Sequence, residues 1–205
     1  MRVYQRRLRR QSIPLFSCIA LLVVVIIGYA MNMQQQKPSI DPRAYAALLG
    51  LIGRVESNNN YNAYYGNADN QEVKFTDMTI AEVMKWQADF VAQGHDSSAV
   101  GRYQIIDSTL ASLVRQLDIN TTEKFDASIQ DQMAIALLER RGSHSYAAEE
   151  LSPQEFAANL AREWAALPRV IGDDPNSSYY AGDGINASRT NVDEVLKAIE
   201  PISTK

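Results

Sequence analysis

The chain has 205 residues, with 20 Lys and Arg against 24 Asp and Glu, so its formal net charge at pH 7 is −4. This acidic balance argues against binding of nucleic acid through phosphate contacts. The single cysteine, Cys18, excludes an internal disulfide scaffold. The length suits one domain with a single hydrophobic core.

The first feature along the chain is an uncharged apolar segment behind a basic N-terminus. Arginines cluster within residues 2–10, and residues 11–36 carry no charge. A helix of about 20 apolar residues crosses a bilayer, and its basic flank stays cytoplasmic. The pattern predicts four parts: a cytoplasmic tail at 1–12, a transmembrane signal anchor at 13–33, a linker at 34–42 and a folded domain at 43–205.

A cleavable signal peptide is the alternative interpretation, because it also begins basic and then turns apolar. The apolar run here exceeds the roughly 7–15 residues usual for such a peptide, and residues 32–37 lack a small-x-small cleavage site. We therefore expect a single-pass membrane protein with a cytoplasmic N-terminus. Its catalytic domain would be periplasmic or extracytoplasmic, or the protein would lie in a virion membrane.

The next feature is a helix that ends at an acidic residue. Asp41 and Pro42 are an N-cap and a first-turn proline, and apolar residues at intervals of three and four continue the pattern to Val55. Glu56 follows directly, and the asparagines at 58–60 stop the helix. This spacing predicts a carboxylate at the rim of the core.

Helical periodicity dominates the rest of the chain, with one exception. Residues 61–76 are rich in Asn, Tyr and Gly and contain a short strand-like piece at 72–75, which predicts a small β-hairpin beside a cleft. Further helices are predicted from capping and apolar spacing at 80–90, 110–117, 129–137, 153–164 and 192–199. The expected fold class is α+β, mostly helical.

Short blocks spread along the chain carry a resemblance to a known family. They are Glu56-Ser57, residues 75–77, 98–106, 130–134, 139–142 and 164–168. In order and spacing they resemble the lambda-type phage endolysin family over roughly residues 43–182. The resemblance implies a lysozyme-like domain, a phage or prophage origin, and lytic transglycosylase activity on peptidoglycan.

Glu56 is the predicted catalytic residue. A carboxylic acid that is partly desolvated keeps its proton near neutral pH and can give it to a glycosidic oxygen. In a lytic transglycosylase one carboxyl group serves first as acid and then as base, and the product ends in 1,6-anhydro-MurNAc. Hydrolysis would need a second carboxylate, and Asp69, Asp77 and Asp96 are the acids nearest the expected cleft. A hydrolytic muramidase and a non-catalytic peptidoglycan-binding module therefore remain alternatives.

Six substrate-binding residues are predicted: Ser57, Tyr64, Gly101, Tyr103, Gln104 and Tyr180. The glycine allows close backbone approach, and aromatic rings in loops pack on sugar faces. Each polar prediction has a structural alternative, because Ser57 could cap its helix, Gln104 could satisfy backbone groups, and Tyr103 could simply pack. Trp86 and Trp164 lie on apolar helix faces and are expected in the core.

The expected partners are peptidoglycan glycan strands and a membrane, with virion or lysis-system proteins as further candidates. Two settings fit, namely local opening of the wall during genome entry and lysis of the host. No metal and no cofactor is expected, because His95 and His144 are far apart in sequence and no ligand-spaced cluster accompanies them.

Overall fold

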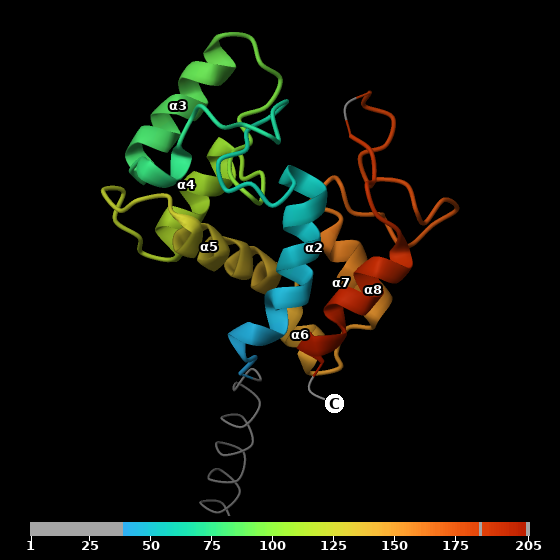
Figure 1. The fold of residues 1–205 in the computed structure, drawn as a ribbon. Coiled ribbons are helices and arrows are strands. Elements are labelled where there is room, and N and C mark those ends of the chain that lie inside the picture. The colour runs from blue at the N-terminus through green and yellow to red at the C-terminus, as the bar shows by residue number, and fades with distance from the viewer. Residues whose placement is uncertain (1–38, 185, 204–205) are drawn as a thin grey trace, which may run out of the picture. The chain divides into compact units, whose positions relative to one another are not determined.

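A computed structural model describes residues 39–184 and 186–203 of the chain (Figure 1). All regular elements of this part are helical. In chain order they are η1 (Pro42–Tyr45), α2 (Ala46–Ser57), η2 (Phe75–Asp77), α3 (Ile80–Ala92), α4 (Asp107–Gln116), α5 (Ala127–Arg140), α6 (Ser143–Ala147), α7 (Pro153–Leu160), α8 (Val192–Ile199) and η3 (Glu200–Ile202).

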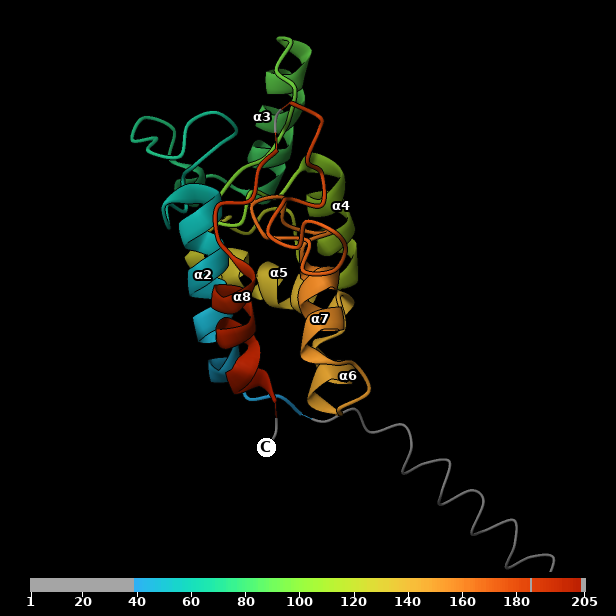
Figure 2. The same ribbon diagram turned by 90° about the vertical axis from the view of Figure 1, so that its right-hand side faces the viewer.

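Helix α2 is the central element of the domain. It runs between a group formed by α3, α4 and α5 and a second group formed by α6, α7 and α8, and it lies beside α8 in both Figure 1 and Figure 2. Leu48 and Ile52 are fully buried, and Val55 is 5% exposed. A helix with neighbours on most sides needs apolar residues around most of its circumference. The burial of α2 therefore fixes where its C-terminal end, with Glu56, can lie.

The predicted helix starts are confirmed. Asp41 caps the first turn, which is a 3-10 helix that continues into α2. Thr79 and Ser152 each form a complete capping box with the Glu three residues later. Helix α7 ends at Leu160, before the predicted end at 164. The residues that follow contact α2 and the turn at 101–104, since the Ala166 N–H donates to Glu56 and the Trp164 indole N–H donates to the Tyr103 carbonyl.

The prediction of an α+β fold with a β-hairpin is wrong. The described residues contain isolated bridges, such as Tyr64 with Asn67 and Tyr64 with Val100, but no strand. Side chains take the place of a strand partner. The Asn70 amide donates to the carbonyls of Asn62 and Val73 at 2.5 and 2.7 Å. Backbone groups that would have formed a hairpin ladder are thereby satisfied locally.

The predicted membrane topology is also corrected. No helix within residues 39–184 and 186–203 is long and apolar enough to cross a bilayer. The anchor was placed at 13–33, with the basic tail at 1–12, and both segments lie outside the described residues. The single-pass localisation rested on hydropathy and charge alone, and the described part of the protein gives it no support.

Candidate active site

A cleft of about 700 Å3 opens at the C-terminal end of α2. Its walls come from the loop after α2, the loop after α3, the turn before α4, and the segments that follow α7 and precede α8. The lining residues are Glu56, Tyr64, Tyr65, Gly66, Asn67, Ala68, Asp96, Ser97, Ala99, Gln104, Ile106, Glu163, Trp164, Ala165, Tyr180, Asn186 and Arg189. Four predicted site residues, Glu56, Tyr64, Gln104 and Tyr180, thus share one cleft.

Glu56 lies in the last turn of α2, just before Asn58 ends the helix in a left-handed conformation with φ 53°. Its side chain is partly buried, and Oε1 accepts a hydrogen bond from the Ala166 backbone N–H at 3.1 Å. Burial raises the pKa of Glu56, while the Ala166 N–H and the positive charge of Arg189 act in the opposite direction. Desolvation is the largest of these effects, so the carboxyl group holds its proton more strongly than a solvated glutamate.

Ser57 is fully buried next to this carboxyl group. Its hydroxyl lies 3.0 Å from the Gly53 carbonyl and 2.8 Å from the Arg102 carbonyl, and these two acceptors share its single proton. The second contact ties the end of α2 to the turn at 101–104. Ser57 therefore connects the two elements that carry Glu56 and Gln104.

The turn at 101–104 is built around a close contact between Gly101 and α5. Gly101 has φ 76°, and a Cβ at this position would meet the Gln130 amide, with Cδ at 2.9 Å. Gln130 Oε1 accepts from the Arg102 backbone N–H at 2.9 Å, which holds the turn against α5. Gln104 also has a positive φ, 48°, and its amide donates to the Gly101 carbonyl at 2.9 Å.

Tyr103 points away from the cleft, into the domain. It is 1% exposed, and its hydroxyl donates to Asp131 Oδ1 at 2.6 Å. The Arg102 guanidinium lies over the rings of Tyr61 and Tyr103 and donates to both hydroxyls at 2.9 Å. Burial raises the pKa of Tyr103, so this phenol stays protonated. Ser57, Gly101 and Tyr103 are not among the described residues that line the cleft.

Tyr64 and Tyr180 stand on different walls. The Tyr64 ring contacts three other rings, those of Phe75, Trp86 and Phe90, with centroids at 5.3–6.3 Å. Tyr180 is 41% exposed, and its hydroxyl donates to the Arg162 carbonyl at 2.9 Å. The Tyr64 ring is thus packed in an aromatic cluster, whereas Tyr180 lies on an exposed loop.

Trp164 is 3% exposed, and its indole N–H donates to the Tyr103 carbonyl at 3.2 Å. Trp86 is partly buried in the aromatic cluster under Tyr64. Both tryptophans pack against the hydrophobic core, as expected, although Trp164 follows the end of α7 and does not lie on a helix face. Trp164 also lines the cleft, so this residue lies where the core meets the site.

The comparisons with known proteins bear on the part of the chain that contains this cleft. The sequence profile of the endolysin family matches residues 46–181. The chain belongs to the endolysin family. It is therefore a phage cell-wall-degrading enzyme, and peptidoglycan is its substrate. Neither a curated protein nor a solved structure matches the chain.

The family match contains all seven predicted site residues but not the whole cleft. Asn186 and Arg189 line it from beyond the matched range. Arg189 donates from Nη1 to the Val55 carbonyl at 3.2 Å, and its backbone N–H donates to the Ala166 carbonyl at 2.8 Å. Sequence analysis gave no role to Arg189, or to Ala166 although it lies in the block at 164–168, because an isolated arginine and a backbone N–H give no local pattern.

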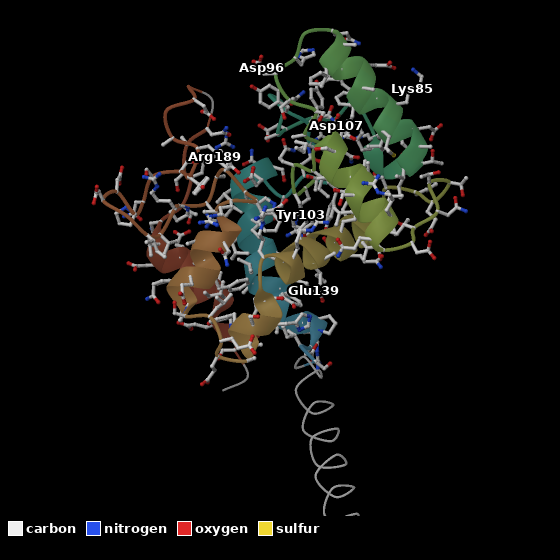
Figure 3. All side chains as sticks on the ribbon, turned by 180° about the vertical axis from the view of Figure 1, so that it is seen from behind. Lys85, Asp96, Tyr103, Asp107, Glu139 and Arg189 are labelled. Carbon is white, nitrogen blue, oxygen red and sulfur yellow. The ribbon has the colours of Figure 1, made fainter. Side chains whose placement is uncertain are left out.

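The cleft of this endolysin also holds acids besides Glu56. Asp96 lines it from the loop after α3, and Figure 3 shows this residue and Arg189 on separate loops. Glu163 lines it too, and Arg141 pairs with its carboxylate at 2.6 Å. Asp69, one of the acids considered from the sequence, accepts from the Asn58 amide at 2.9 Å. The described residues contain no group of three His, Cys, Asp or Glu side chains arranged to hold a metal ion.

Proposed function

We propose that this endolysin is a lytic transglycosylase that cuts the β-1,4 bond from MurNAc to GlcNAc, with Glu56 as its catalytic acid and base. The observation that carries the proposal is the environment of Glu56. Its carboxyl group is partly buried at a cleft of about 700 Å3, and burial raises its pKa. A general acid must keep its proton until substrate is bound, and desolvation is the usual way to achieve this near neutral pH.

The hydrogen bond from Ala166 distinguishes the two oxygens of the Glu56 carboxyl group. Oε1 accepts from the Ala166 N–H, and among the described residues Oε2 has no hydrogen-bond partner. One oxygen is therefore fixed, and the other is available for proton transfer. A single anchored oxygen suits a group that must give a proton and later take one from a nearby atom.

The reaction proceeds in two proton transfers. Glu56 first protonates the glycosidic oxygen as its bond to C1 of MurNAc breaks, which releases GlcNAc O4 as a hydroxyl and leaves positive charge on the muramoyl ring. The C6 hydroxyl of the same MurNAc then attacks C1, and the Glu56 carboxylate takes its proton. The product is 1,6-anhydro-MurNAc, no water is consumed, and Glu56 is again protonated.

Side chains on both walls fit a polysaccharide substrate. Tyr64 and Tyr180 offer ring faces on which the CH-rich face of a sugar packs. Gln104 reaches the cleft from a turn that is fixed by Gln130, so its amide is positioned to bond an acetamido or hydroxyl group. We infer that these three residues bind glycan on either side of Glu56.

A hydrolytic muramidase is the second candidate, because the cleft contains further carboxylates. Asp96 is exposed and could activate a water molecule, whereas the Glu163 carboxylate is paired with Arg141. The first candidate is favoured because its chemistry needs only Glu56. It also agrees with the sequence resemblance to the lambda-type endolysins.

The decisive experiment compares the full-length wild type with Glu56→Gln on purified peptidoglycan, with Glu72→Gln, an exposed glutamate, as matched control. Wild type and Glu72→Gln should clear the substrate, and Glu56→Gln should lose at least about 100-fold in rate. Clearing by Glu56→Gln at the wild-type rate would remove Glu56 from the mechanism.

Product analysis decides between the two reactions. The reaction is run in water enriched in heavy oxygen, and the released muropeptides are weighed by mass spectrometry. A transglycosylase gives anhydro products that are lighter by one water and carry no heavy oxygen. Products with a labelled reducing end would show hydrolysis and overturn the transglycosylase assignment.

A further inference from the structure

Arg189 brings a positive charge to the cleft from outside the endolysin match, which ends at residue 181. It lies in the segment just before α8, and Figure 3 shows it on the loops near the end of α2. The side chain is exposed and lines the same cleft as Glu56. Its position raises the question of what a cation does beside a carboxylic acid that must give up a proton.

Two contacts connect Arg189 with the surroundings of Glu56. Its backbone N–H donates to the carbonyl of Ala166 at 2.8 Å, and the N–H of Ala166 in turn donates to Glu56. Its Nη1 donates to the carbonyl of Val55, the residue before Glu56. Arg189 therefore binds both the helix end that carries the acid and the residue that anchors the acid.

The charge of Arg189 is less neutralised than that of other arginines around α2. Arg54 pairs with Glu194, Arg102 with Asp131 and Arg141 with Glu163. By contrast, no carboxylate within residues 39–184 and 186–203 forms a direct ion pair with Arg189, and Val55 takes only one of its five guanidinium N–H groups. Most of its charge can thus act on the cleft.

Other charged groups belong to the elements packed around Glu56. Arg54 lies two residues before it on α2 and Arg102 lies in the turn at 101–104, and neither lines the cleft. The segment after α7 supplies Glu163, and the loop after α3 supplies Asp96. The two arginines are each balanced by a carboxylate partner, Glu163 is balanced by Arg141, and Asp96 is negative. Arg189 is therefore the cation placed to favour the anionic form of Glu56.

We infer that Arg189 is a positioning residue for Glu56: it holds Val55 and Ala166 in the arrangement that anchors the acid, and it stabilises the carboxylate that forms when the proton is transferred. The inference rests on the proposed function of Glu56. The proton moves from Glu56 to the glycosidic oxygen and later from the C6 hydroxyl back to Glu56. Arg189 keeps its own protons throughout, because a guanidinium is not deprotonated in proteins.

The electrostatics agree with this arrangement. Burial raises the pKa of Glu56, and the charge of Arg189 lowers it against that effect. Interactions between charges are stronger in a partly desolvated cleft than in water. Removal of the Arg189 charge should therefore make Glu56 a weaker acid.

The test uses the full-length chain with two neutral variants, Arg189→Met and Arg189→Gln, and one charge-keeping variant, Arg189→Lys. Arg54→Met is the matched control, because Arg54 is close to Glu56 along α2 but is balanced by Glu194. The pH profile of kcat/KM is measured on peptidoglycan, where the basic limb reports loss of the Glu56 proton. In parallel, the Glu56 carboxyl carbon is titrated by NMR and assigned with Glu56→Gln.

We expect both neutral variants to move the basic limb and the carboxyl titration to higher pH, with a loss of kcat on the order of tenfold. Arg189→Lys and Arg54→Met should keep the wild-type limb. If the profile and titration of folded neutral variants superimpose on the wild type, or move to lower pH, the inference fails while the role of Glu56 stands. If the wild type has no activity, the proposed function fails, and the carboxyl titration still decides whether Arg189 acts on Glu56.

Discussion

The two walls of the cleft are stabilised in different ways. The turn at 101–104 is fixed from inside by buried polar side chains, since Gln130, Ser57 and Gln87 all bond its backbone or that of its neighbours. The opposite wall, from 164 to 189, meets Glu56 through the Ala166 backbone and Arg189, and much of it is loop. One wall is thus held by buried side-chain hydrogen bonds, and the other contacts the carboxyl group of Glu56 and the end of its helix.

The two walls also differ in how far apart along the sequence their contacting residues lie. The turn of the first wall lies in the block at 98–106 that the sequence analysis singled out, and its fixing contacts reach Ser57 and Gln130, 45 and 28 positions from Arg102. The second depends on contacts between residues more than a hundred positions apart, such as Glu56 with Ala166. Variants in the first wall should therefore act mainly on stability, and variants in the second mainly on the acid.

The largest expected effect on the free energy of unfolding is at Gly101, in the turn at 101–104. Gly101→Ala should destabilise the fold by about 3–4 kcal/mol, because it combines the cost of a positive φ with a clash against Gln130. Gly94→Ala is the matched control, since Gly94 also has a positive φ, 94°, but a Cβ there meets nothing within 4 Å. It should cost about 1–2 kcal/mol. Urea unfolding measures both, and equal losses would show that Gln130 can move aside.

The next effect tests the tyrosine pair behind the same wall. Tyr103→Phe should cost about 1–2 kcal/mol, because it removes a buried hydroxyl that bonds both Asp131 and Arg102. Tyr61→Phe removes a hydroxyl with the same two partners at a more exposed position, so it should cost about half as much. The double variant should be less destabilised than the sum of the two, because they share partners. Strict additivity in urea unfolding would show that the two hydroxyls act independently.

The sequence predicts those parts of the site that depend on local spacing. The end of α2, with Glu56 after Val55, follows from apolar periodicity and from the asparagines that stop the helix. The inward direction of Tyr103 does not follow, because a turn has no fixed period that separates inside from outside. Sequence analysis left this open between packing and substrate contact, and the structure buries the ring against α5.

The parts that could not be predicted depend on backbone groups and distant contacts. The hairpin was expected from strand-like residues at 72–75, but the Asn70 side chain satisfies the local backbone and no ladder forms. The N–H of Ala166 could belong to any residue type, so its contact with Glu56 leaves no trace in the sequence. Arg189 lies outside the recognisable blocks, and only the fold places it in the cleft.

On the second wall, burial of Glu56 should cost stability in a pH-dependent way. An acid whose pKa is raised by folding is favoured in its protonated form, so the fold loses stability as pH rises above about 4.5, its ordinary value. Glu56→Gln cannot ionise and avoids this loss. Its Tm should exceed that of the wild type at pH 8, and this difference should shrink as the pH falls toward 4.5. A Tm difference that is constant with pH in thermal scans would show that the acid titrates normally.

The smallest effect on stability is expected at Tyr180, on the exposed part of the second wall. Tyr180→Phe loses only the bond to the Arg162 carbonyl, so it should change stability by less than about 0.5 kcal/mol and keep its activity. Tyr180→Ala also removes the ring, and kcat/KM should fall by roughly three- to tenfold if a sugar packs on that face. Because Tyr180 is 41% exposed, the two variants should unfold alike. Equal kcat/KM for both variants would show that substrate does not contact this ring. Glycan binding would then depend on the opposite wall of the cleft, which carries Tyr64.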